Sequence, residues 1–259
     1  GDWTEEVCSG VAALLIAAFD PPRAVALYDA GIAELRCGRD AAALELVKRA
    51  AAVDPESVPT RVLVAHLAAL RAAADGDLVR AGQVLAAAIE RDGAQELLLA
   101  DLAQVHVARV LGATRPGSAA FDLAKKTCDE AIARMPRSAR LFALRGALAS
   151  KERRFAAARA DFDRAIALDP ASFHARLEAG RLAARVRDFA RAERLYRAAL
   201  GVSPDSFEAR LERAIALREQ IGGASDEDYE ESYRAARDAI AGAISAAPER
   251  AEGYLHFAV

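Results

Sequence analysis

The pattern of small, aromatic and polar positions repeats along the chain, and the repeat is clearest between Ser138 and Pro204. Two consecutive stretches share one layout, SARLFALRGALASKERRFAAARADFDRAIALDP and FHARLEAGRLAARVRDFARAERLYRAALGVSP. Each predicts two helices joined by a short turn, with one face of the pair buried and a second face left for the next pair. Equivalent residues lie 34 positions apart: Gly146 and Gly180, Phe155 and Phe189, Ala158 and Ala192, Phe162 and Tyr196, Ala165 and Ala199, and Pro170 and Pro204.

The glycines and the aromatic residues of this pattern predict closely packed helix pairs. Gly146 and Gly180 fall in the middle of helices, where glycine costs roughly 1 kcal/mol relative to alanine. We therefore expect each glycine to be needed for a close approach of two helices. Phe162 and Tyr196 are expected to fill the gap between the helices of their own pair.

The ends of the predicted helices are also marked in the sequence. Pro170 and Pro204 end the second helix of each pair, because proline cannot continue a helix. Ser172 and Ser206 follow two residues later, and their side-chain oxygens are expected to cap the next helix.

Glycine, then Ala-x3-aromatic, then proline, at a period of 34 residues, resembles the tetratricopeptide repeat (TPR). The resemblance covers roughly residues 24–259 and is most specific in the two stretches above. It implies an all-α fold, a right-handed α-solenoid of TPR-like helix-turn-helix repeats. It also implies a non-enzymatic scaffold for protein-protein interaction, which binds a peptide segment or a partner helix in its concave groove.

The remaining repeats are placed by the same small, aromatic and proline positions. Two of them, near 112–118 and near 219–228, carry insertions between their helices, and the glycine and proline content favours loops over longer helices there. The expected order is a capping helix or partial repeat at 1–23, TPR-like repeats at 24–57, 58–95 (extended), 96–138, 139–172, 173–206 and 207–250, and the start of a truncated seventh repeat at 251–259.

The incomplete seventh repeat leaves two other interpretations open. The chain could be a regulatory or targeting fragment of a larger protein whose missing region carries enzymatic or membrane-assembly activity. It could also be a structural module that self-associates, because exposed repeat ends can stack on one another. The repeat pattern does not decide among these and the scaffold.

Charge is distributed unevenly along the chain. The net charge of −3 is too small to predict a nucleic-acid or membrane surface by itself. Residues 137–218 nevertheless carry 18 basic and 10 acidic residues, whereas residues 219–259 carry 3 and 9. The basic middle of the chain and its acidic ends are therefore more informative about the charge of a partner than the net charge is.

Composition and the lack of certain sequence features bear on the fold and on the cellular compartment. Apolar residues make up 53% of the chain but aromatic residues only 6%, which favours helices. No apolar run of about 18 residues predicts direct membrane insertion, and three scattered cysteines indicate a reducing compartment. We expect a cytoplasmic protein, with a periplasmic or exported one, its signal removed, as the alternative. The excess of arginine over lysine is typical of a GC-rich, bacterial genome.

No cluster of residues in the sequence predicts catalysis. His66, His106, His174 and His256 are widely separated and lack the spacing of a metal site, so no metal and no cofactor are expected. No G-x-S-x-G elbow and no phosphate-binding glycine loop occurs, and no interleaving of aromatic and basic residues predicts single-stranded nucleic acid. The sequence predicts a protein that is not an enzyme and whose partner is another protein or peptide.

The resemblance implies where a partner would bind. In TPR proteins the first helix of each repeat lines the concave face, and a few of its positions contact ligand. Because equivalent first-helix positions become neighbours, the cations of repeats four and five are expected to repel one another and to favour an acidic partner. A solvated helix face in an arginine-rich protein is the other interpretation. The ligand positions carried over are Arg140, Lys151, His174, Leu177, Arg181, Arg185 and Arg218.

Some TPR proteins hold the carboxylate end of chaperones with a clamp of lysine, arginine and asparagine side chains. This chain has Tyr28, Ile32, Leu63, Leu97 and Asp101 at the equivalent places. The resemblance therefore implies that this particular clamp is absent.

Overall fold

The computed structural model describes residues 24–36, 39–113, 116–221 and 226–246. The expected capping helix at 1–23 and the expected start of a seventh repeat at 251–259 lie outside the described residues. Within them the chain forms helices and no strand, which confirms the all-α prediction. The helices are α2 (Ala24–Arg36), α3 (Asp40–Val53), α4 (Val58–Ala74), α5 (Leu78–Asp92), α6 (Glu96–Ala113), α7 (Ala119–Arg134), α8 (Ala139–Lys151), α9 (Phe155–Leu168), α10 (Phe173–Arg185), α11 (Phe189–Leu200), α12 (Phe207–Ile221) and α13 (Asp226–Ala246).

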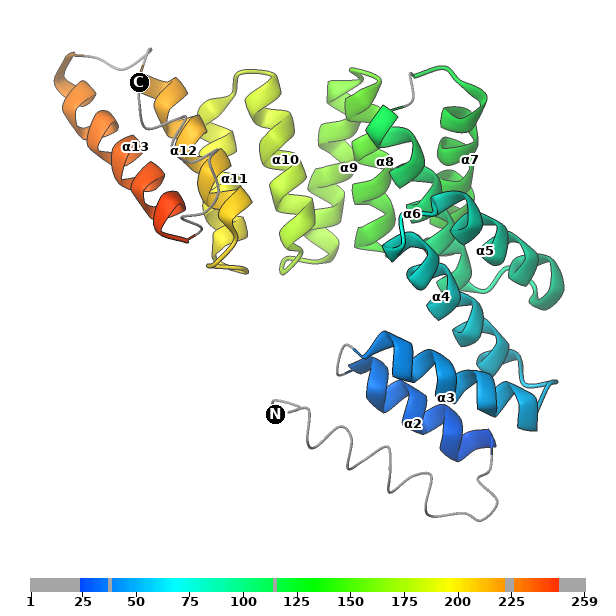
Figure 1. Ribbon diagram of the computed structural model, residues 1–259. Helices are drawn as coiled ribbons and strands as arrows, with labels where there is room; N and C mark the ends of the chain where they lie inside the picture. The colour runs from blue at the N-terminus through cyan, green and yellow to red at the C-terminus, as the bar shows by residue number, and fades with distance from the viewer. Residues whose placement is uncertain (1–23, 37–38, 114–115, 222–225, 247–259) are drawn as a thin grey trace. The chain divides into compact units, whose positions relative to one another are not determined.

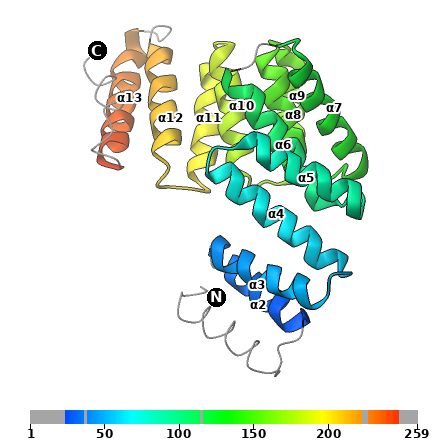
Figure 2. The same cartoon turned by 45° about the vertical axis from the view of Figure 1, so that its right-hand side comes forward.

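The helices form two compact units, one of residues 1–134 and one of residues 135–259. In the first, α2 packs on α3, α4 on α5 and α6 on α7; in the second, α8 packs on α9, α10 on α11 and α12 on α13 (Figures 1 and 2). Successive pairs also pack on one another, α3 on α4 and α5 on α6 in the first unit, and α9 on α10 and α11 on α12 in the second. Each unit is therefore a helical-repeat solenoid.

The helix pairs of the second unit are as closely packed as the glycines predict. A Cβ atom built on Gly146 would lie 3.0 Å from the ring of Phe162, and one on Gly180 would lie 2.5 Å from the ring of Tyr196. Real Cβ atoms essentially never show a distance as short as the one at Gly180, and the one at Gly146 is shorter than nine in ten real Cβ contacts. Both rings are buried. The glycines thus admit the rings, which confirms the role expected for the recurring Gly and aromatic positions.

The predicted serine caps are present. The Ser172 hydroxyl accepts a hydrogen bond from the backbone N–H of Ala175 at 3.4 Å, and that of Ser206 accepts one from Ala209 at 3.3 Å. The caps fix the starts of α10 and α12, the helices that follow Pro170 and Pro204.

The insertions take a different form from the expected loops. Gly112 lies inside α6, an 18-residue helix, and α13 begins at Asp226 and runs for 21 residues. Much of the extra length therefore extends helices, and for these residues the preference for loops is wrong. Alanine and leucine around Gly112 favour the helix enough to outweigh one glycine. Residues 114–115 and 222–225 lie outside the described residues.

The turns between the two helices of a pair differ in how well each second helix is capped. Asp188 precedes α11 and accepts a hydrogen bond from the Arg191 backbone N–H at 3.1 Å. Arg154, 34 residues earlier, occupies the same place before α9 and makes no side-chain cap hydrogen bond. The two repeats therefore supply a matched comparison of one capped and one uncapped helix.

Arg154→Asp is expected to raise the free energy of unfolding by about 1 kcal/mol, because a carboxylate can accept the free N–H of the first turn and suits the positive end of the helix dipole. The exposed ion pair of Arg154 with Glu152, at 3.3 Å, contributes little that would be lost. Urea denaturation followed by circular dichroism measures the change. Asp188→Ala should shift stability by a similar amount in the opposite direction, and a stability loss in Arg154→Asp would contradict this account.

The same turns hold two arginines in the left-handed backbone region. Arg153 has φ of 60° and Arg187 has φ of 63°, whereas the turn before α5 uses Gly76, with φ of 81°. A non-glycine residue there costs roughly 1–2 kcal/mol, and glycine gives part of this back through its larger entropy when unfolded. The arginines are therefore strained positions within otherwise regular turns.

Arg153→Gly is expected to stabilise the protein by about 0.5–1 kcal/mol, the difference between the relief of backbone strain and the added entropy of the unfolded chain. Arg153→Ala keeps the strain and should leave the urea midpoint close to that of the parent. Equal midpoints for the glycine and alanine variants would show that the backbone strain has no measurable cost.

Candidate partner-binding surface

The first helices of the second unit lie side by side, because α8 packs against α10 and α10 against α12. Arg140, His174 and Arg185 are exposed on α8 and α10, and Lys151 and Arg218 are partly exposed at or near the carboxyl ends of α8 and α12. These side chains therefore lie on one set of adjacent helices, as the repeat positions predicted. We refer to Arg140, Lys151, His174 and Arg185 below as the basic face.

Leu177 does not share this exposure. It is 2% exposed and packs in the core with Tyr196 and Ala209. Its position in the repeat led us to expect a ligand contact, but an apolar side chain at that position gains more from burial between the helices than from solvent. Leu177 therefore packs in the core, and its side chain is not accessible to a partner.

Arg181 is neutralised by its own chain. Its guanidinium lies 2.8 Å from a carboxylate oxygen of Glu178, 3.0 Å from one of Glu212 and 3.6 Å from one of Glu208. Burial disfavours the charged form, but the hydrogen bonds and negative charges of Glu178 and Glu212 outweigh it and raise the pKa of Arg181. The repulsion expected among the cations of repeats four and five was wrong for Arg181, because α12 brings two carboxylates to it.

Arg185 links two first helices. Its Nη1 donates to the backbone oxygen of Ser150 and to the Ser150 hydroxyl, both at 3.2 Å. This contact joins the end of α10 to the end of α8, next to Lys151, as expected for equivalent positions of adjacent repeats. Arg218 lies beyond α10 on α12, where it pairs with the neighbouring Glu219 at 2.9 Å.

An ion-pair network around the buried Glu193 was not predicted from the sequence. Glu193 of α11 is buried and accepts from Arg197 at 2.6 Å and from Arg213 of α12 at 2.9 Å. Burial raises the pKa of Glu193, but the hydrogen bonds from the two arginines outweigh this effect and lower it. The four-residue spacing of Glu193 and Arg197 was visible in the sequence, whereas Arg213 joins them only through the packing of α11 on α12.

The first unit holds a buried aspartate beside a partly buried histidine at one of the positions equivalent to the chaperone clamp. Asp101 of α6 is buried, and its carboxylate lies 2.5 Å from Nδ1 of His66 on α4. The carboxylate opposes binding of a second carboxylate at that place.

Metal binding and membrane insertion gain no support from the described residues. No group of three or more histidine, cysteine, aspartate and glutamate side chains there could hold a metal ion. None of the described helices combines the length and the apolar character needed to cross a membrane.

Comparisons with solved structures find the same architecture at low sequence identity. The APC/C hetero-tetramer Cut9-Hcn1 matches with a TM-score of 0.75 at 14% identity over 97% of this chain, which spans only 45% of that one. TTC0263, a thermophilic TPR protein from Thermus thermophilus, matches with a TM-score of 0.60 at 22% identity, over 75% of this chain and 98% of its own. YrrB, a TPR protein with an unusual peptide-binding site, matches with a TM-score of 0.54 at 18% identity, over 83% and 100%.

No protein-family profile matches the sequence, and no curated relative matches it either. The stacked helix pairs and the solved structures agree with the 34-residue pattern in the sequence. This chain therefore has the fold of TPR proteins, an all-α solenoid of helix-turn-helix repeats.

Proposed function

We propose that this protein is a non-enzymatic scaffold for protein-protein interaction, and that its basic face binds an acidic segment of a partner protein. The main support for this proposal is the set of cations at Arg140, Lys151 and Arg185 on the adjacent helices α8 and α10. Hydrogen bonds from Arg185 to Ser150 connect the two helices. Arginine suits such a partner because its planar guanidinium can bind a carboxylate through two parallel hydrogen bonds.

The contacts of Arg181 argue against its taking part in the proposed binding of an acidic segment. Arg181 already has three carboxylates within 4 Å, so a partner would gain little from it and would meet negative charge beside it. The acidic segment would instead run along α8 and the carboxyl end of α10, where Arg140, Lys151 and Arg185 lie. The peptide-binding site named for YrrB is a property of that protein, and it supports the choice of a peptide as the first probe.

The test uses a fluorescent glutamate-rich peptide and its glutamine-matched counterpart, with binding followed by anisotropy. We expect the glutamate peptide alone to bind, and binding to weaken with salt because exposed charges are screened beyond about 8 Å at physiological ionic strength. The double variant Arg140→Glu, Arg185→Glu should lose about tenfold or more in affinity. Equal binding of both peptides, or unchanged affinity in the folded double variant, would overturn the proposal.

A matched control carries the same charge change elsewhere. Arg164 of α9 and Arg194 of α11 are exposed on second helices of the same two repeats. Arg164→Glu with Arg194→Glu alters the net charge by the same amount but leaves the basic face intact. It should reduce affinity far less than the first pair, and an equal reduction would assign the effect to net charge alone.

A further inference from the structure

The turns that follow α4, α8 and α10 share one backbone geometry. In each, the residue with positive φ donates its backbone N–H to the carbonyl oxygen three residues earlier, at 2.9–3.1 Å, and the next residue donates to the carbonyl oxygen five residues earlier, at 2.9 Å. This is the Schellman motif, whose left-handed position is usually glycine. Gly76 holds that position after α4, whereas Arg153 and Arg187 hold it after α8 and α10. Glycine would therefore fit all three turns with the same hydrogen bonds.

Contacts within the chain do not account for the two arginines. Both are exposed, and a side chain at this position strains the backbone. Among the described residues, the Arg153 guanidinium has no ion pair or hydrogen bond. The Arg187 guanidinium lies over the ring of Phe189, 5.7 Å from its centroid, and such a contact is weak where water has access. Backbone strain that no contact within the chain offsets is typical of functional sites.

The two turns adjoin the basic face. The backbone oxygen of Ser150 accepts from the Arg153 N–H at 3.1 Å and from Nη1 of Arg185 at 3.2 Å, so these two arginines meet at one carbonyl group. Lys151 follows Ser150 directly, and Arg187 follows Arg185 by two residues. Arg153 and Arg187 therefore extend the basic face beyond the ends of α8 and α10.

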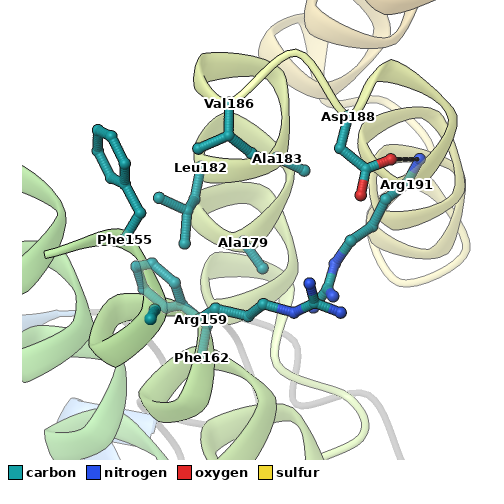
Figure 3. A pocket seen from close by; sticks show the side chains of 10 residues that line it. Phe155, Arg159, Phe162, Ala179, Leu182, Ala183, Val186, Asp188 and Arg191 are labelled. Atoms are coloured by element: carbon teal, nitrogen blue, oxygen red, sulfur yellow. Dashed lines mark hydrogen bonds between the residues drawn. The ribbon is translucent and has the colours of Figure 1, made fainter. Parts of the chain in front are cut away.

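The carboxylates of these turns are already engaged. Basic residues outnumber acidic ones by five to two over 151–154 and 185–188. Glu152 lies 3.3 Å from the guanidinium of Arg154. Asp188 accepts a hydrogen bond from the backbone N–H of Arg191 at 3.1 Å, beside the pocket between α9 and α10 (Figure 3). The turns thus keep an excess of positive charge next to the basic face.

We propose that Arg153 and Arg187 bind the acidic segment together with the basic face, so that the segment continues across the turns that follow α8 and α10. This inference rests on the proposed function and adds two residues to the same site. A guanidinium can bind a carboxylate of the partner through two hydrogen bonds, which glycine cannot do. The strained arginines then contribute to affinity at the expense of stability.

Stability and affinity are expected to change in opposite directions in the glycine variant, Arg153→Gly with Arg187→Gly. Its urea midpoint should rise, because glycine relieves the strain of both turns. Its affinity for the fluorescent glutamate-rich peptide should fall by about threefold or more, because two cations of the site are lost. The dissociation constant should also rise less steeply with salt than that of the parent.

The alanine variant, Arg153→Ala with Arg187→Ala, separates charge from strain. It keeps a side chain at both left-handed positions, so its urea midpoint should stay close to that of the parent. Its loss of affinity should equal that of the glycine variant. The matched control is Arg164→Ala with Arg194→Ala, which removes the same charge from exposed positions of α9 and α11 and should change affinity by less than about twofold.

The outcomes separate this inference from the proposed function. Unchanged affinity in the glycine and alanine variants, with a loss in the Arg140→Glu, Arg185→Glu variant, would overturn the inference and leave the proposed function standing. A loss in the Arg164→Ala, Arg194→Ala control equal to that of the turn variants would assign the effect to net charge and would also overturn it. A parent protein that does not bind the glutamate peptide would overturn both. Circular dichroism of each variant checks that a loss of binding is not a loss of fold.

Discussion

Tyr196→Ala is expected to lower the free energy of unfolding by about 3–5 kcal/mol, the range found when a large buried aromatic side chain is removed and leaves a cavity. Tyr196 is among the largest fully buried side chains of the protein, and it packs against Leu177 and Ala209 from two neighbouring helices. Its loss therefore weakens both its own repeat and the contact with the next. Urea denaturation followed by circular dichroism measures the loss.

Tyr196→Phe is the matched control, because it keeps the ring and removes only the hydroxyl. That hydroxyl donates to Glu212 over 3.4 Å, a long hydrogen bond, so we expect a loss of about 1 kcal/mol or less. If the phenylalanine variant lost as much as the alanine variant, the ring would not be the stabilising part.

Gly180→Leu is expected to cost about 3 kcal/mol, because its first added carbon already falls 2.5 Å from the ring of Tyr196. Neither α10 nor the buried ring can move away without disturbing the packing on both sides. Gly242→Ala is the control within α13, where the nearest atom to an added Cβ is the tip of Arg210 at 4.0 Å. It should stabilise the helix by about 0.5–1 kcal/mol.

A double variant separates steric clash from any other effect at this site. In the Tyr196→Ala background the ring is gone, so Gly180→Ala should be neutral or stabilising there, while it destabilises the parent. The two changes are then strongly coupled. Additive losses in the double variant would mean that Gly180 is not required for the approach of the ring.

The 34-residue pattern predicted the helix pairs because each of its positions has a local reason. Gly146, Gly180, Phe162 and Tyr196 act within one pair, and the chain that forms the pair is contiguous. The insertions were harder to predict, because helix propensity and a single glycine compete at Gly112, and the helix continued. Rules that use only the neighbouring residues do not predict whether a helix continues through a single glycine.

The partner surface was predicted less completely, because its electrostatics depend on residues from different repeats. Arg181 was singled out as a cation, but Glu208 and Glu212 come from the following repeat and neutralise it. Leu177 was assigned by its place in the repeat, although its apolar side chain turns into the core. If the first helix of each repeat is compared with the first helix of the next repeat in the sequence, the carboxylates beside Arg181 can be predicted.

The ion pairs between repeats have a consequence for how the protein folds during its synthesis. Arg181 and Glu193 belong to the fifth repeat, yet Glu212 and Arg213, which complete their partners, are supplied by α12. During synthesis from the amino terminus, α10 and α11 leave the ribosome before α12 does. The fifth repeat therefore emerges with its charges only partly paired, and it reaches its full stability when the sixth arrives to complete it.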